Sequence, residues 1–257
     1  MAALSENRKT NGSIILLDSG NYESWWLRDK NWNNSAFNSV LKNELADLAF
    51  CFDNQIPPSD IEENSKELLK STFDSQKLTE STTIIPIAHS ASSDLAQTIN
   101  RVCEMGGNYC IAIPERILGD GILARVCTIT DIRKQLNKRD GYTFLHILGT
   151  GNPFTLALLS FAGADSFDGL EWCQTTVDFG TARLYHFQQR ELFNHDCSFC
   201  FDSSLDYATA TLGHNLLFFQ NWMLAIQNAI KLGTETDFIN QWFSQTIIDR
   251  LNEIWRL

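Results

Sequence analysis

The sequence has no long hydrophobic run and no recognisable leader segment. No stretch approaches the roughly 18 apolar residues that a membrane span needs, although hydrophobic residues make up 44% of the 257 positions, which is ample for a buried core. The segment from Met1 to Ser13 is polar and mixed in charge, so no secretory signal is visible. These features predict a protein without a membrane partner.

The sequence also lacks a disulfide framework and an excess of positive charge. Its seven cysteines are odd in number and form no small-scaffold pattern, which favours a reducing cytoplasmic location. Lys and Arg number 20 against 31 Asp and Glu, for a net charge of −11. This balance disfavours a nucleic-acid binder that acts by electrostatics alone, but it is compatible with a local basic patch.

Six short apolar runs alternate with segments of helical periodicity, near residues 14, 47, 84, 110, 144 and 166. This alternation predicts a parallel sheet with crossover helices. Side chains that could do chemistry follow five of the runs, namely Asp18, Asp53, His89, Glu115 and Asp168. Because the carboxyl ends of parallel strands carry the active sites of α/β proteins, we expect these side chains to form a site.

One βαβ unit stands at the centre of this pattern. Phe144–Leu148 predicts a buried strand, Gly149 begins a turn, and Pro153–Phe161 predicts a short helix that Gly163 ends. A second short strand follows and leads into Asp168.

The other helices are predicted from apolar periodicity. Their expected ranges are 36–42, 59–75, 94–105, 121–136, 216–232 and 237–255. Ser59 and Glu62 have capping-box spacing at the start of the second helix. Residues 21–32, which carry three tryptophans, are expected to form a loop, and residues 171–187 to be partly β. The apolar side chains of the last two helices are interpreted as core.

A zinc site is predicted near the C-terminus. Cys197 and Cys200 stand in C-x-x-C spacing, with His195 before them and His214 after them. Zinc prefers four nitrogen or sulfur ligands in a tetrahedron, and C-x-x-C presents two thiolates from one turn. Because protein side chains can fill all four positions, we expect structural zinc. A redox pair and two unpaired buried cysteines are the alternative interpretations.

Four of these segments resemble motifs of the tRNA-guanine transglycosylase superfamily. They are Leu17–Gly20, His146–Gly151, Ala164–Asp168, and His195–Cys200 followed by His214. In order, they resemble the family's strand-end D-S-G motif, its penultimate strand with a G-x-G turn, the segment of its nucleophilic aspartate, and its zinc site with histidine replacing the first cysteine. The resemblance covers the chain from Ile14 to about Ile230.

The resemblance implies an α/β fold of the (β/α)8 TIM-barrel type, here without the first two strands, with a small zinc-binding subdomain near the C-terminus. Residues 1–190 would form the partial barrel, 191–214 the zinc-binding subdomain, and 215–257 helices that pack on the barrel.

The resemblance also implies a pentosyltransferase that exchanges guanine in nucleic acid for a 7-deazaguanine base such as preQ1 or queuine. The polymer would be tRNA, with DNA as the alternative. Asp168 would be the nucleophile of a covalent aspartyl-glycosyl intermediate, and Asp18 would handle protons. The plainer interpretations are a turn at Asp168–Gly169 and a helix N-cap at Asp18–Ser19.

The base pocket would be built from several of the strand-end residues. Ser19 and Asp53 would hydrogen-bond the purine edge, since a carboxylate accepts N–H groups with charge assistance. His89 and Glu115 are further candidates. Gly149 would let the backbone approach the base or ribose closely.

The sequence leaves two other functions open. The chain could be a catalytically silent partner subunit that pairs with an active enzyme, or a different zinc-bearing barrel enzyme that acts on a small nucleoside. The family resemblance makes a homodimer the usual expectation, and the silent-subunit alternative implies a heterodimer.

Overall fold

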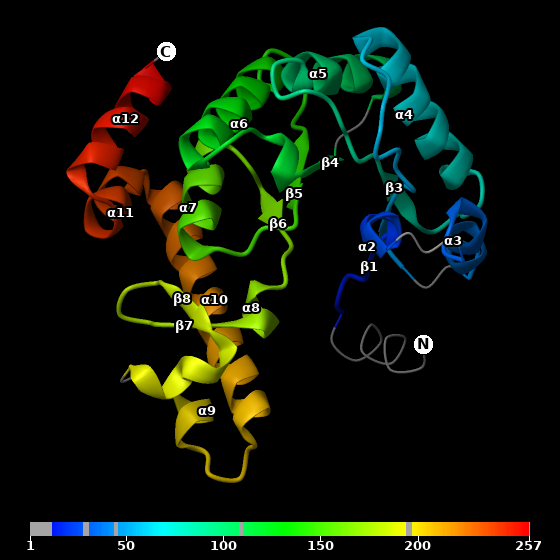
Figure 1. Ribbon diagram of the computed structural model, residues 1–257. Coiled ribbons are helices and arrows are strands. Elements are labelled where there is room, and N and C mark those ends of the chain that lie inside the picture. Colours follow the sequence, from blue (N-terminus) through cyan, green and yellow to red (C-terminus); the bar gives the residue numbers. More distant parts are fainter. Residues whose placement is uncertain (1–11, 28–30, 44–45, 108–109, 194–196, 257) are drawn as a thin grey trace. The chain divides into compact units, whose positions relative to one another are not determined.

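The computed structural model describes residues 12–27, 31–43, 46–107, 110–193 and 197–256. It has a mixed α/β fold in which short strands alternate with longer helices through Phe167 (Figure 1). The chain divides into two units. Unit 1 comprises Met1–Ile117 and Lys134–His146, and unit 2 comprises Leu118–Arg133 and Ile147–Leu257.

Unit 1 contains a parallel sheet of three strands, β1 (Leu16–Leu17), β2 (Leu48–Phe50) and β3 (Thr83–Ile85), paired in that order. Beyond β3, Ile87 forms a parallel bridge with Ala112 of β4 (Cys110–Pro114). Consecutive strands are therefore neighbours, as is usual for short crossover connections between parallel strands.

Helices α3 (Asn34–Leu41), α4 (Ile61–Gln76) and α5 (Leu95–Gly106) connect these strands. Helix α5 buries Leu95, Ile99 and Val102, which are spaced four and three residues apart and so lie on one face. The capping box expected at Ser59 is wrong by one residue, because Asp60 is the N-cap and its carboxylate accepts the Glu63 N–H at 2.8 Å.

The segment that was expected to be a loop begins with helix α2 (Asn21–Leu27). A preceding turn holds it in place: the Asn21 N–H donates to Ser19 Oγ at 3.3 Å, and the Trp32 indole donates to the Ser19 carbonyl at 2.8 Å. At Gly20, where φ is +65°, a Cβ would lie 2.9 Å from the Trp32 Nε1. This tryptophan therefore packs against the turn.

Helix α6 (Ile122–Leu136) and strand β5 (Phe144–Leu148) contribute residues to both units. A short 3-10 helix, η1 (Glu115–Ile117), follows β4. Strands β4, β5 and β6 (Ser166–Phe167) form a second sheet in that order.

The central βαβ prediction is confirmed. Helix α7 (Pro153–Ala162) starts with Pro153, and the side chain of its N-cap, Asn152, accepts the N–H groups of Phe154 and Thr155 at 3.1 and 3.3 Å. Gly163 ends the helix with φ +114°, a conformation that favours glycine.

The rest of unit 2 differs in part from expectation. Residues 171–187 include α8 (Glu171–Gln174) and an antiparallel pair, β7 (Thr175–Val177) and β8 (Leu184–His186). The 3-10 helix η2 (Phe187–Leu192) and α9 (Ser198–Phe201) follow. Helix α10 (Tyr207–Leu232) starts well before residue 216, and the expected helix 237–255 is two helices, α11 (Glu235–Trp242) and α12 (Gln245–Arg256).

An aromatic cluster forms the core of unit 2. Its centre is Trp222 of α10, which is 5% exposed. The Trp222 ring stacks on Phe218 at 5.5 Å and meets Phe238 and Trp242 edge-on at 5.1 and 4.9 Å. Its indole N–H donates to the Pro153 carbonyl at 2.8 Å. The prediction that the apolar side chains of these helices are core is thus confirmed for this cluster.

The described strands form sheets of three, three and two strands, and none of these sheets is closed. The structure therefore shows an α/β fold with short parallel strands. The division into 1–190, 191–214 and 215–257 stays a prediction, and α10 runs without a break through residues 214 and 215. Within the described ranges, no helix combines the length and the apolar character that a membrane crossing requires.

The aromatic core gives a stability prediction. Trp222→Ala should lower the free energy of unfolding by about 3–5 kcal/mol, because it leaves a large cavity among rings that cannot collapse. Urea unfolding followed by circular dichroism measures this loss. Leu232→Ala on the same helix, at a side chain that is 72% exposed, should stay within about 0.5 kcal/mol. Equal effects from both variants would contradict the assignment of Trp222 to the core.

Candidate functional site

The polar residues that follow the strands lie where the sequence predicts them. Asp18 directly follows β1 and is exposed, and Asp168 directly follows β6 and is half-buried. Asp53 and His89 lie a few residues beyond β2 and β3 and are buried. Glu115 follows β4 as the first residue of η1.

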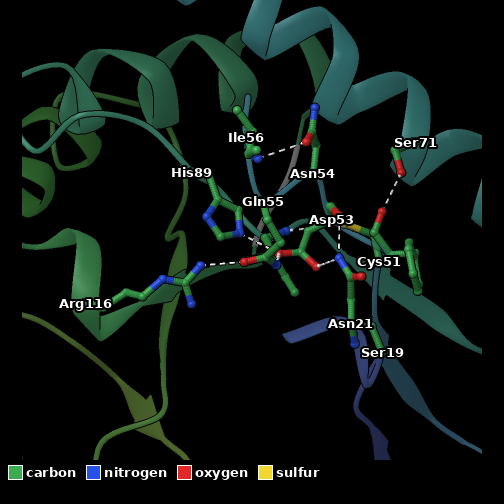
Figure 2. A network of polar contacts seen from close by, with 12 residues as sticks. Ser19, Asn21, Cys51, Asp53, Asn54, Gln55, Ile56, Ser71, His89 and Arg116 are labelled. Atoms are coloured by element: carbon green, nitrogen blue, oxygen red, sulfur yellow. Dashed lines mark hydrogen bonds and ion pairs between the residues drawn. The ribbon is translucent and has the colours of Figure 1, made fainter. Parts of the chain in front are cut away.

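The Asp53 carboxylate is the centre of a buried polar network in unit 1 (Figure 2). Its Oδ1 accepts the Asn21 amide at 3.0 Å, and its Oδ2 accepts the Gln55 amide at 2.5 Å. The same Oδ2 makes a short hydrogen bond with His89 Nε2. Burying a carboxylate is costly unless hydrogen bonds satisfy it, and these three side chains supply them.

Two predicted residues, Ser19 and His89, are therefore brought to Asp53 by the loops after β1 and β3. Ser19 is 2% exposed and is linked to Asp53 through Asn21. The Ser19 hydroxyl oxygen accepts the backbone N–H of Asn21, and the Asn21 side-chain amide also donates to the Asp53 carbonyl at 2.6 Å. The His89 carbonyl accepts the amide of Asn64 at 2.7 Å, which fixes the loop after β3 against α4.

Sequence reasoning missed three members of this network: Asn21, Gln55 and Arg116. The Arg116 guanidinium donates to Gln55 Oε1 at 2.5 Å and lies 4.7 Å from the centre of the Tyr22 ring. Gln55 follows Asp53 in a polar run and Arg116 follows Glu115. Their positions after strands could thus have marked Gln55 and Arg116 as candidates. The contact between the two side chains depends on the loop conformation, which the sequence does not show.

Cys51 lies beside the same network, and burial raises the pKa of its thiol to about 12. The Ile87 N–H donates to its Sγ at 3.4 Å. This thiol is therefore neutral at physiological pH and unsuited to act as a nucleophile.

In unit 2, Asp168 is attached to the turn that begins at Gly149. The Gly149 N–H donates to Asp168 Oδ1 at 2.5 Å, and the Thr150 N–H donates to the Asp168 carbonyl at 2.6 Å. Gly149 has φ +78°, and a Cβ there would meet no atom within 4 Å. The backbone conformation at Gly149 thus favours glycine.

A cleft of about 530 Å³ opens beside Asp168. Its size is in the range of small-molecule sites. The apolar side chains that line it are Leu156, Phe167, Trp172, Leu216, Phe219 and Met223. The polar side chains are Thr150, Asp165, Ser166, Asp168 and Gln227. The Asp168 carboxylate therefore borders a pocket that is lined by both apolar and polar side chains.

A cluster of three possible metal ligands is also present in unit 2. Cys197, Cys200 and His214 place their ligand atoms within 4.8 Å of one another. The Nδ1 of His214 lies 3.5 Å from the Cys197 sulfur and 3.6 Å from the Cys200 sulfur. Tetrahedral zinc, with its usual bond lengths, would separate such sulfur and nitrogen ligands by about 3.6 Å. The fourth expected ligand, His195, lies outside the described residues.

The surroundings of His214 prepare it to bind a metal. This side chain is fully buried, and its Nε2 lies 2.7 Å from the Val177 carbonyl. Because a carbonyl can only accept, Nε2 carries the proton, which leaves the Nδ1 lone pair directed toward the two sulfurs. The His214 ring also stacks on Phe179 at 4.5 Å.

Burial, together with the adjacent Cys197, raises the pKa of the Cys200 thiol to about 12. Redox-active cysteines have lowered thiol pKa values, so Cys200 lacks that feature. The arrangement can hold a metal ion that joins the turn at Cys197 to helix α10.

The sequence matches no model of a known protein family. Among curated proteins, the search likewise found no match.

Removing one ligand should remove the metal. We expect about one zinc equivalent per chain in the purified protein, and close to none in His214→Ala, because the loss of this buried ligand leaves the site incomplete. Elemental analysis measures both. Cys173→Ser is the matched control, since Cys173 is outside the cluster and should keep the metal. Equal metal content in wild type and His214→Ala would contradict the assignment.

Gly213 gives a second test of this cluster. A Cβ at Gly213 would lie 2.3 Å from Phe199 Cδ1, so Gly213→Ala should push α9 and Cys200 away from His214. We expect metal affinity to fall about tenfold or more, measured by competition with a chromogenic chelator. Phe199→Ala in the same chain should restore most of the affinity, because it removes the clash. A double variant as weak as Gly213→Ala would contradict this explanation.

Proposed function

We propose that this chain is a pentosyltransferase that exchanges guanine in nucleic acid for a 7-deazaguanine base. The observation that carries this proposal is the Asp168 carboxylate, which borders a cleft of about 530 Å³ and is oriented by the Gly149 N–H. The resemblance of several strand-end segments to tRNA-guanine transglycosylases adds to it. In α/β folds, a carboxylate at the end of a parallel strand is well placed for catalysis.

The chemistry requires a nucleophile that can also leave. Asp168 attacks the anomeric carbon of the nucleotide, the bond from that carbon to the guanine nitrogen breaks, and a glycosyl ester forms. The departing guanine takes a proton. The incoming deazaguanine then loses a proton from its own ring nitrogen, attacks the same carbon and releases the Asp168 carboxylate. This two-step course parallels that of retaining glycosidases.

Asp18 would move these protons, since a second carboxylate is the usual partner in such reactions. Asp18 is exposed after β1, so solvent can exchange protons with it.

The base would bind near Asp53, with Ser19, His89 and Glu115 in supporting roles. The hydrogen bonds from Asn21 and His89 support this proposal, because they hold the Asp53 carboxylate in a fixed orientation. Gly149 would let the sugar or base approach the backbone near Asp168.

The proposal includes a β/α barrel without its first two strands and a structural zinc ion. The barrel is supported by the fact that consecutive strands are neighbours. The zinc ion is supported by the sulfur–nitrogen distances around His214. The nucleic acid is tRNA or DNA, the incoming base is of the preQ1 or queuine type, and the chain acts in the cytoplasm as a homodimer or heterodimer.

A second candidate function is a silent partner subunit of such an enzyme. One observation favours it: both carboxylate oxygens of Asp53 already accept hydrogen bonds from side chains of this chain. A base could bind Asp53 only by displacing one of them. Under this candidate, the chain alone would incorporate no base.

The nucleophile is tested by base exchange. Purified protein is incubated with labelled guanine and either tRNA or DNA, and label in the polymer is counted. Asp168→Asn should lower incorporation at least about a thousandfold, as expected for a nucleophile. The amide oxygen can still accept the Gly149 N–H, so the fold should be retained.

A covalent intermediate gives an independent readout. In wild type, a protein–nucleic acid adduct should survive denaturing electrophoresis when no incoming base is added, and it should be absent from Asp168→Asn. Equal label incorporation by both proteins would remove Asp168 from the mechanism.

A further inference from the structure

Gln55 bridges two groups that themselves do not pair. Its amide nitrogen donates to Asp53 Oδ2 at 2.5 Å, and its amide oxygen accepts from Arg116 at 2.5 Å. In Figure 2, the Gln55 carboxamide lies between the guanidinium and the carboxylate. All three residues belong to unit 1. One carboxamide thus lies between a hydrogen-bond acceptor and a hydrogen-bond donor.

Asp53 and Arg116 each have a further partner besides Gln55. Asn21 and His89 hold the Asp53 carboxylate through hydrogen bonds in which Gln55 takes no part. The Tyr22 ring, 4.7 Å from the Arg116 guanidinium, supports the arginine by a cation–π contact. Acceptor and donor would therefore keep their places if the glutamine side chain moved.

Gln55 also lies outside regular secondary structure. It lies in the connection between β2 and α4, where residues 51–60 form neither helix nor strand. Its side chain is half-buried, and its neighbour Ile56 is 74% exposed. A rotation of this side chain would break two hydrogen bonds and no element of secondary structure.

A carboxamide and a lactam present the same hydrogen-bonding edge. Each has an N–H donor next to a C=O acceptor. Guanine, hypoxanthine and 7-deazaguanines carry this edge at ring positions 1 and 6. Adenine carries the reverse pattern, with an acceptor at position 1 and a donor at position 6. Its ring nitrogen would face the Asp53 carboxylate, which is also an acceptor, and its amino group would face the Arg116 guanidinium, which is also a donor.

We propose that Gln55 holds the place of a lactam base and is displaced when that base binds. The ring N–H then donates to Asp53, and the ring carbonyl accepts from Arg116. Arg116 becomes the residue that distinguishes lactam bases from adenine, and Gln55 becomes an internal competitor. The inference rests on the proposed function for the ligand being a nucleobase, and it adds two residues to the base site.

An internal competitor lowers the apparent affinity of the protein for the ligand that it imitates. The reason is that only a fraction of the molecules have the Gln55 side chain displaced and can bind the ligand. This yields an unusual expectation: truncating a residue that lines the site should strengthen binding. A purely structural role for Gln55 would weaken binding or leave it unchanged.

The test is calorimetric titration of the full chain with hypoxanthine and, separately, adenine. Gln55→Ala should bind hypoxanthine about three- to tenfold more tightly than wild type. Arg116→Met should bind it about tenfold more weakly, since it loses a charge-assisted hydrogen bond. Ile56→Ala is the matched control, because Ile56 is in the same loop and its side chain is 74% exposed, and its affinity should equal that of wild type.

Adenine should bind at least about tenfold more weakly than hypoxanthine to wild type and to Gln55→Ala. Hypoxanthine binding that is unchanged or weaker in Gln55→Ala, or equal binding of the two bases, would overturn the inference. Circular dichroism of each variant shows whether weaker binding results from unfolding or from loss of the binding site alone.

These outcomes are independent of base exchange. Tighter hypoxanthine binding by Gln55→Ala, with no label incorporated by wild type, would overturn the proposed function and retain the inference. Label incorporation with no effect of Gln55 or Arg116 would do the reverse.

Discussion

A buried carboxylate must be satisfied by hydrogen bonds, and in unit 1 this requirement joins the loops that follow the strands. Asp53 receives Asn21 from the region after β1, Gln55 from its own loop and His89 from the loop after β3. Arg116, after β4, joins through Gln55. Each contact has a large sequence separation except the one from Gln55. The polar edge of this unit is therefore organised around one charge, since leaving that charge unsatisfied would cost several kcal/mol.

Unit 2 is organised around helix α10. Its first turns carry His214, which lies beside the two cysteines, and Asn215, whose amide donates to the carbonyls of Trp172 and Thr175 at 2.8 and 2.7 Å. Further along, Leu216, Phe219 and Met223 line the cleft at Asp168. Because Trp172 also lines that cleft, a metal ion at His214 would stabilise one of its walls. The metal cluster and the cleft are thus linked by one rigid element.

The two polar centres differ in how far they are satisfied. The Asp53 network satisfies its carboxylate with side chains of the chain itself, including the carboxamide of Gln55. Asp168 instead borders open space and is oriented by a backbone N–H. Asp53 is therefore a fixed hydrogen-bond acceptor, whereas Asp168 is accessible from the cleft.

The sequence by itself determined the strand positions, the βαβ unit around Gly149, the C-x-x-C ligand pair and the placement of Asp53, His89 and Asp168 after strands. These features depend on local periodicity, turn chemistry and spacing, which are readable along the chain. Only the tertiary structure decided that residues 21–27 are helical, that α10 begins at Tyr207, and that Gln55 connects Arg116 to Asp53. These depend on contacts between residues far apart in sequence: an indole that reaches the Ser19 carbonyl, a histidine fixed by Val177, and a loop residue that binds an arginine 61 positions away. No local pattern encodes such pairings, because packing against a distant partner overrides intrinsic propensity.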